Sequence, residues 1–123
     1  MKICYDVSKI VLGEGKDARK LDKIWKGKIE LNMPRYTTRM SYIRNCNFQV
    51  NDQGEANVNN EMMDSVVKMG EYLEKHIGKV DVEHIPSGTK IVKAEELQFY
   101  TEAQDLLSWL SGKMLQGVKL GEN

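Results

Sequence analysis

Residues 11–20 read VLGEGKDARK and place Gly13, Gly15 and Ala18 in a G-x-G-x-x-A spacing. In a dinucleotide-binding fold, glycines at this spacing let the backbone approach a pyrophosphate where a crossover helix begins. Only nine residues separate Gly15 from Trp25, whereas a crossover between parallel strands needs about a dozen or more. The spacing therefore predicts a turn in which glycine supplies positive φ, and no nucleotide site.

Other patterns that carry catalysis or metal binding are missing from the sequence. His76 and His84 stand at no metal-ligand spacing from a cysteine or from clustered carboxylates. Glu95 and Glu96 are adjacent, so on a helix they diverge by about 100° and cannot share a site. No P-loop and no nucleophile elbow is present. We therefore expect no catalytic residue, no cofactor and no metal, and we expect His76 to act as a cation near a helix end.

Length, charge and cysteine content narrow the class of protein. The 123 residues indicate one domain, residues 1–123. Eighteen basic residues balance eighteen acidic ones, so no net charge attracts nucleic acid or an anionic membrane. Asp6 interrupts the apolar stretch that a signal peptide needs, and no run reaches transmembrane length. Cys4 and Cys46 lie in apolar patterns, which predicts reduced core thiols in a soluble protein of the cytoplasm.

The clearest local pattern is the strict alternation in residues 25–33, WKGKIELNM, which is typical of a half-buried antiparallel strand. Residues 3–7 alternate as well, and the β-branched pair at 10–11 extends them. These two segments predict an antiparallel β-hairpin within residues 1–33, with a long, partly turned connection. The residues expected on the apolar face of the second strand are Trp25, Gly27, Ile29, Leu31 and Met33.

A helix headed by Pro34 is expected next. Three arginines lie in it, Arg35, Arg39 and Arg44, and residues 31–51 contain no acidic residue. The arginines are either a solvated flank of the helix or a docking face for an acidic partner. The apolar residues at helical spacing are Met33, Tyr36, Met40, Ile43 and Cys46.

A second helix is expected over residues 60–77, ended by Gly78. Its apolar arc covers more than half of the helix, which is wider than a surface helix requires. Such an arc belongs to the central helix of a core, or to a helix with one edge against another chain. Met63 and Val67 lie beside the main stripe, and methionine suits an adaptable binding surface.

The last third of the chain predicts a short extended segment over residues 80–85, a short helical turn over 94–99 and a final helix. Thr101 and Gln104 form a capping box, T-x-x-Q, at the start of that helix. Trp109 points away from its apolar stripe, and is either covered by the hairpin or exposed for a partner. Together the elements predict a helix-dominated α+β fold, in which a short N-terminal β-hairpin packs on three main α-helices and residues 34–123 are mainly helical.

Residues 94–105 contain acidic residues and no basic ones, which complements the arginine-containing helix. The two charged segments meet either within one chain or between neighbouring copies, as a head-to-tail association. The acidic residues are Glu95, Glu96, Glu102 and Asp105.

The order of the elements resembles a family of phage proteins. A strand that runs straight into a Pro-headed helix, GKIELNMPRYTTRMSYI, precedes a long amphipathic helix, an extended DVEHI…SGTKI segment, KAEELQFY and a final helix. The terminal GVKLGEN is similar to the Gly…Leu-Gly-Lys-Asn ending of many members. In these features the chain resembles the small tail assembly chaperones of lambda-like bacteriophages, which are encoded just before the tape measure protein.

The resemblance implies a non-catalytic phage or prophage protein that coats the tape measure protein, keeps it soluble and helps to recruit the tail tube protein in the host cytoplasm. Lysine codons near the end often form the family's frameshift site, and Glu122 replaces a lysine there. Two alternatives stay open: a small regulatory or nucleic-acid-associated protein that uses the arginines, and a structural tail-completion protein. The residues offered for partner binding are Arg35, Arg39, Met63, Val67 and Trp109.

Overall fold

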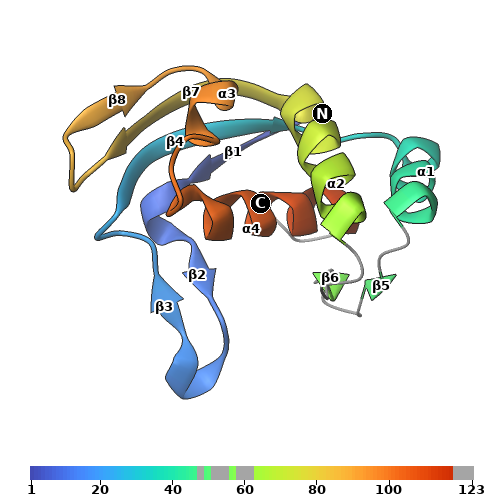
Figure 1. Cartoon of the computed structure of the whole chain (residues 1–123), viewed down its shortest axis with the longest axis horizontal. Helices are drawn as coiled ribbons and strands as arrows, with labels where there is room; N and C mark the ends of the chain where they lie inside the picture. The colour runs from blue at the N-terminus through green and yellow to red at the C-terminus, as the bar shows by residue number, and fades with distance from the viewer. Residues whose placement is uncertain (47–48, 51–55, 58–62, 118–123) are drawn as a thin grey trace.

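The chain is built on a four-stranded antiparallel sheet in the order β1-β4-β7-β8 (Figure 1). The computed structural model describes residues 1–46, 49–50, 56–57 and 63–117. The strands of the sheet are β1 (Lys2–Asp6), β4 (Trp25–Asn32), β7 (Ile77–His84) and β8 (Thr89–Ile91). The α-helices are α1 (Tyr36–Cys46), α2 (Met63–His76), α3 (Ala94–Leu97) and α4 (Ala103–Gln116).

Two further pairs of short strands lie outside this sheet. β2 (Val11–Leu12) pairs with β3 (Arg19–Lys20), and β5 (Gln49–Val50) pairs with β6 (Ala56–Asn57). Short 3-10 helices precede and follow β2: η1 (Val7–Lys9) and η2 (Gly15–Asp17). Residues 11–20 form an arm that projects away from the sheet (Figure 1).

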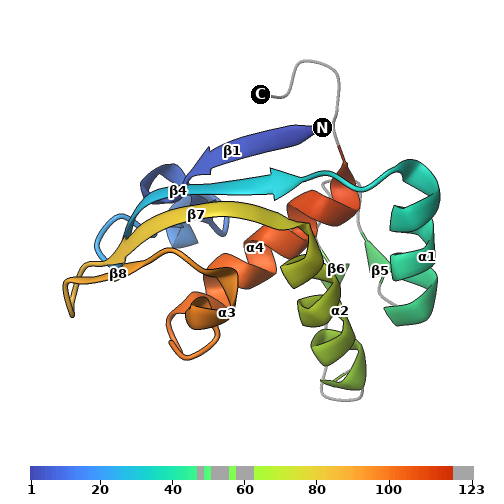
Figure 2. The ribbon, with the colours of Figure 1, turned by 90° about the horizontal axis from the view of Figure 1, so that it is seen from above.

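Alternation along β4 gives the sheet one apolar face and one charged face. Trp25 and Ile29 are fully buried, whereas Lys26 between them is exposed and pairs with Glu83 of β7 at 3.4 Å. Figure 2 shows α2, α3 and α4 on one side of the sheet. A sheet covered on one side only needs this apolar-in, polar-out pattern.

The core fills the space between the apolar face of the sheet and the helices. Trp25 lies near one end of it, where its Nε1–H donates to the main-chain carbonyl of Glu102 at 3.3 Å. Its ring also contacts those of Tyr100 and His84, with centroids 5.7 and 4.9 Å away. The largest fully buried side chains are Trp25, Ile29, Leu31, Leu73, Ile91, Leu97, Leu106, Leu110, Met114, Val7, Val82 and Cys46.

The predicted pairing of the two N-terminal strands is confirmed. β1 pairs antiparallel with β4, and Tyr5 lies opposite Ile29. The predicted length of the first strand was wrong, because β1 ends at Asp6 and Val11 belongs to the arm. The carboxylate of Asp6 accepts hydrogen bonds from the backbone N–H and the hydroxyl of Ser8, at 3.1 and 2.7 Å, and so caps η1.

The prediction of a mainly helical region after residue 33 is confirmed only in part. Its four α-helices are present, but β7 and β8 from the same region complete the sheet. β7 is eight residues long, where only a short extended segment was predicted. Ile77 was expected at the end of the second helix and instead begins β7, opposite Leu31. Residues 60–62 of that predicted helix lie outside the described residues.

α1 turns the predicted face to the core only in part, since Cys46 at its end is buried as expected. Tyr36 and Met40 were expected inside but are 65% and 39% exposed. Tyr42 packs inward instead, because its ring stacks on that of Tyr72 in α2 with centroids 4.1 Å apart. The rotation of α1 is therefore set by an aromatic contact to another helix.

His76 joins three elements at the end of α2. Its Nδ1 lies 2.9 Å from the carbonyl oxygen of Asn32, and its Nε2 lies 2.7 Å from the hydroxyl of Tyr42. With its proton on Nδ1, the ring donates to the carbonyl and accepts from the hydroxyl. Both ring nitrogens of His76 therefore have partners, which fixes the ring between α1, α2 and the end of β4.

Two local predictions were wrong. Cys4 was expected in the core, but the alternation of β1 places it on the charged face, where it is exposed; Cys46 is buried as expected, and both are free thiols. The capping box did not form, since α4 begins at Ala103 and has no side-chain cap hydrogen bond. The carbonyl of Thr101 accepts instead from the backbone N–H of Gln104, at 3.2 Å, in the turn before the helix.

Stability is expected to fall at alkaline pH because of one buried and one partly buried group, Cys46 and Tyr42. Burial raises the pKa of the Cys46 thiol, against an opposing effect of Lys68, and burial also raises the pKa of Tyr42. A group with a raised pKa in the folded state stabilises the fold below its unfolded value, and that contribution is lost as the pH rises from the unfolded towards the folded value. We expect the loss to begin near pH 9.0, the ordinary value for the thiol.

Urea unfolding at a series of pH values tests this prediction. In Cys46→Ala the alkaline loss of stability should be smaller than in the unchanged protein, whatever the cost of the cavity at neutral pH. Cys4→Ala is the matched control, because that thiol is exposed. An unchanged alkaline slope in Cys46→Ala would show that the buried thiol does not contribute.

Candidate functional site

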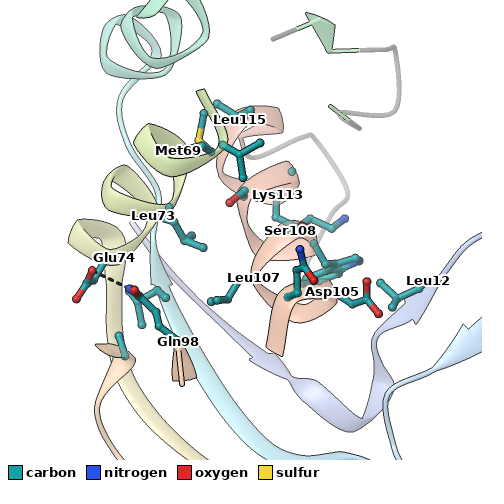
Figure 3. Close-up of a pocket in the computed structure, with 18 of the residues that line it drawn as sticks. Leu12, Met69, Leu73, Glu74, Gln98, Asp105, Leu107, Ser108, Lys113 and Leu115 are labelled. Atoms are coloured by element: carbon teal, nitrogen blue, oxygen red, sulfur yellow. Dashed lines mark hydrogen bonds between the residues drawn. The ribbon is translucent and has the colours of Figure 1, made fainter. Parts of the chain in front are cut away.

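A wide groove opens on the helical side of the molecule, between α2, α4 and the arm (Figure 3). Its volume is about 1120 Å³. The flank of α4 from Gln104 to Gln116 forms the floor. In Figure 3, Leu12 of the arm lies on the other side of α4 from Leu73 of α2, so the arm and α2 are the two walls.

The arm exists because glycine permits its turn. Gly13 and Gly15 have φ of 78° and 58°, which confirms the turn predicted for the G-x-G-x-x-A spacing. A Cβ on Gly13 would lie 2.9 Å from the main-chain oxygen of Asp17, so no larger residue fits there without a shift. Arg19 holds the arm to α4 through an exposed ion pair with Asp105, at 2.6 Å.

The floor of the groove carries short side chains. Ser108, Ser111 and Gly112 line it at positions that share one flank of α4. Short side chains let another backbone approach closely, since the distance between packed helices depends on the side chains at the contact. Apolar side chains line the groove on either side of this strip, including Leu12 of the arm and Val67 of α2.

Acidic side chains outnumber basic ones around the groove. Four carboxylates and two cations line it, which leaves an excess of two negative charges. One carboxylate, that of Glu74, accepts a hydrogen bond from Gln98 at 2.9 Å (Figure 3, dashed line). The charged residues that line the groove are Glu14, Glu71, Glu74, Asp105, Arg19 and Lys113.

Two of the predicted partner-binding residues line this groove. Val67 is 60% exposed on the α2 wall. Trp109 is half-buried: its ring meets that of Tyr5 edge-on at 5.0 Å, and Lys113 Nζ lies 5.2 Å from the ring centroid. β1 therefore covers one side of Trp109 and another side lines the groove, and a partner contact at Trp109 stays a prediction. The backbone of Met63 begins α2, and its side chain lies outside the described residues.

The other two predicted partner-binding residues that the structure describes, Arg39 and Arg35, lie outside the groove. Arg39 Nη1 donates to the main-chain carbonyl of Gln116 at 3.0 Å, in the last turn of α4. A cation is favourable there, because the final carbonyls of a helix lack helical partners. Gly117 follows with φ of 72°, and a Cβ on it would collide with this guanidinium. Arg35 precedes α1, is exposed and does not line the groove.

The predicted acidic and basic segments do not meet within one chain among the described residues. Arg39 reaches the end of α4 and not its acidic start, where Asp105 pairs with Arg19. Head-to-tail association between copies stays a prediction.

His84, Ser87 and Glu102 form a network that sequence reasoning missed. His84 Nδ1 lies 2.7 Å from Ser87 Oγ, and its Nε2 lies 2.7 Å from Glu102 Oε1. Ser, His and a carboxylate are the residues of a hydrolytic triad. Here Ser87 lies in the exposed β7–β8 turn, where its Oγ also lies 2.9 Å from Thr89 Oγ1, and none of the three residues lines the groove. The network fixes this turn to the start of α4.

Comparison with protein family models, with curated protein sequences and with solved structures found no match. Among the residues that the structure describes, no three His, Cys, Asp or Glu side chains are grouped as metal ligands would be. Within the same residues, no helix has the length and apolar character needed to cross a membrane.

Proposed function

We propose that this protein is a tail assembly chaperone of a phage or prophage, a non-catalytic protein of the host cytoplasm that binds helical segments of the tape measure protein. The observation that carries the proposal is the groove between α2, α4 and the arm. It combines apolar walls, a floor of short side chains and an excess of acidic groups. The family resemblance suggests the partner, and the groove supports the kind of segment that binds.

The dimensions of the groove suit a helix. Its floor follows α4, which has 14 residues and so is about 21 Å long at 1.5 Å per residue. About four turns of a partner helix fit along that length. The short side chains of Ser108, Ser111 and Gly112 let such a helix lie close to α4.

The chemistry of the lining favours an amphipathic helix with basic flanks. An apolar stripe on that helix would cover Val67 and Leu107. Lys and Arg side chains beside the stripe would face Glu14 and Glu71, which make no ion pair within the described part of the chain. The tape measure protein is long, so many copies of this protein can bind along it. Their combined avidity is high even when each groove binds weakly.

The nucleic-acid alternative has less support than the groove. It requires a basic face on α1, and one of its three arginines, Arg39, already donates to the end of α4. Binding to DNA or RNA at moderate salt, weakened by Arg35→Ala and Arg44→Ala, would favour it over the chaperone.

Co-expression tests the function directly. We expect a very long, helix-patterned reading frame immediately downstream of this gene, and we expect its product to be soluble and to copurify with this protein. A downstream region without such a frame, or a product that stays insoluble and unbound, would contradict the proposal.

We expect Val67→Arg to weaken binding of that product by at least about tenfold, because it adds a cation to an acidic groove meant for a basic helix. Val92→Arg is a closely matched control, since Val92 is 62% exposed, Val67 is 60% exposed, and Val92 does not line the groove. Titration calorimetry with a peptide from the product measures the difference. Equal affinities of the two variants would place the binding site elsewhere.

A further inference from the structure

β1 is an edge strand of the sheet, and in Figure 2 it is the outermost strand. The backbone N–H of Met33 donates to the carbonyl of Met1 at 2.8 Å, so the main-chain groups of residue 1 point towards β4. Main-chain groups alternate along an antiparallel strand. Those of Ile3 and Tyr5 therefore also point towards β4, whereas those of Lys2 and Cys4 point to the free edge.

Within the residues that the structure describes, this edge lacks most of the usual protection. Proteins shield edge strands with proline, with bulges, with charged side chains, with a covering loop or by making them very short, and of these β1 has only the charges at its two ends. β8, at the other edge, is only three residues long, whereas β1 has five residues, KICYD, without proline or glycine. The pairing of β1 with β4 is regular over all five residues. The structure therefore leaves a regular strand edge on which another strand can be added.

We propose that β1 pairs antiparallel with β1 of a second copy of this chain, centred on Cys4. In this register Lys2 lies opposite the partner's Asp6, and Asp6 opposite the partner's Lys2. Ile3 lies opposite the partner's Tyr5, and the two Cys4 residues face each other. Opposite charges directly across a strand pair are favourable, so KICYD is complementary to itself.

Other registers lose this complementarity. A shift by two residues in either direction leaves neither Lys2 nor Asp6 opposite a charged residue. A shift by one residue brings side chains from the apolar face against side chains from the charged face. Parallel pairing sets Lys2 beside the partner's Lys2. The charges therefore specify both the direction and the register of the pair.

The pair is closed, because the same strand is used on both copies. It joins two four-stranded sheets into one continuous sheet. The two-fold axis is perpendicular to that sheet, so both helical layers lie on the same side and both grooves stay open. The inference does not rest on the proposed function, since it concerns the strand edge of the chain alone.

Sedimentation equilibrium over a range of protein concentrations tests the proposal. We expect a monomer–dimer equilibrium in the reduced protein. Oxidation with diamide should then trap the dimer through a Cys4–Cys4 disulfide, because directly opposed residues that share hydrogen bonds have Cα atoms about 5.5 Å apart, within the range that a disulfide spans. Cys46 is fully buried and serves as the internal control.

Three variants distinguish dimerisation by strand pairing from cross-linking through the Cys4 thiol. Cys4→Ser should still dimerise but should not cross-link. Cys4→Pro removes an outward N–H that makes no bond to β4, and should be monomeric. Lys2→Asp, at a side chain 67% exposed in the monomer, should also be monomeric, because it sets acidic residues opposite each other.

The circular dichroism spectra of Cys4→Pro and Lys2→Asp should match that of the unchanged protein. A wild-type protein that stays monomeric at all concentrations would overturn the proposal. Dimerisation of Lys2→Asp with unchanged affinity would overturn it as well.

Discussion

Truncating Trp25 to alanine is expected to lower the free energy of unfolding by about 3–5 kcal/mol. The side chain is fully buried at the central strand β4, where it contacts the rings of Tyr100 and His84. Removing it leaves a cavity between the sheet and the start of α4. It also leaves the carbonyl of Glu102 without the hydrogen bond from the indole N–H.

Urea unfolding followed by far-ultraviolet circular dichroism measures this effect. Fluorescence is a poor probe, because the variant removes one of the two tryptophans. Phe99→Ala is the control at an aromatic residue that is 87% exposed, and it should change stability by less than about 0.5 kcal/mol. A loss below about 1 kcal/mol in Trp25→Ala would mean that the core closes over the missing ring.

Replacing Gly27 with alanine should destabilise the fold by an amount of the same order, about 2–5 kcal/mol, although it adds one methyl group. Gly27 has φ of 113°, which other residues rarely adopt. A Cβ there would collide with the main-chain oxygen of Asp81 and lie 2.8 Å from Val82 Cα. β4 and β7 are the two central strands, so the methyl group fits only if they separate.

Gly15→Ala distinguishes the two causes. Gly15 also has positive φ, 58°, but nothing lies within 4 Å of a Cβ placed on it. Gly15→Ala should lower the free energy of unfolding by about 1–2 kcal/mol, which is the effect of the backbone conformation alone. The additional loss in Gly27→Ala measures the collision between strands. Equal losses in the two variants would contradict the close approach of β7 to β4.

Elements with one unambiguous period were predictable from the sequence. β4 has strict alternation from Trp25 to Asn32, and its pairing with β1 followed from a second alternating segment. β7 was underestimated, because Ile77 continues the helical spacing of α2 and no proline separates the two periods. The inward face of α1 was predicted only in part: Cys46 is buried but Tyr36 and Met40 are exposed. The contact that orients the helix joins Tyr42 to Tyr72, which are far apart in the sequence.

The candidate site was predictable only as separate residues. Val67 and Trp109 stood out because they lie off an apolar stripe. The groove itself had no local signal, since Leu12, Val67 and Ser108 become neighbours only when the arm, α2 and α4 come together. Ser108 belongs to a flank of α4 that looks merely polar in the sequence. A small side chain on a helix marks a binding surface only when a groove lies above it, and the groove is formed by elements that are distant in the sequence.

The junction between α2 and β7 makes the two walls of the groove unequal. α2 ends at His76 and β7 begins at Ile77, and His76 also bonds Asn32 at the end of β4. The α2 wall is thus anchored in the middle of the sheet. The opposite wall joins α4 through the exposed pair of Arg19 and Asp105, an interaction that contributes little. We therefore expect the groove to open more readily on the side of the arm than on the side of α2. Under the proposed function, partner segments of different width would then fit without repacking of the core.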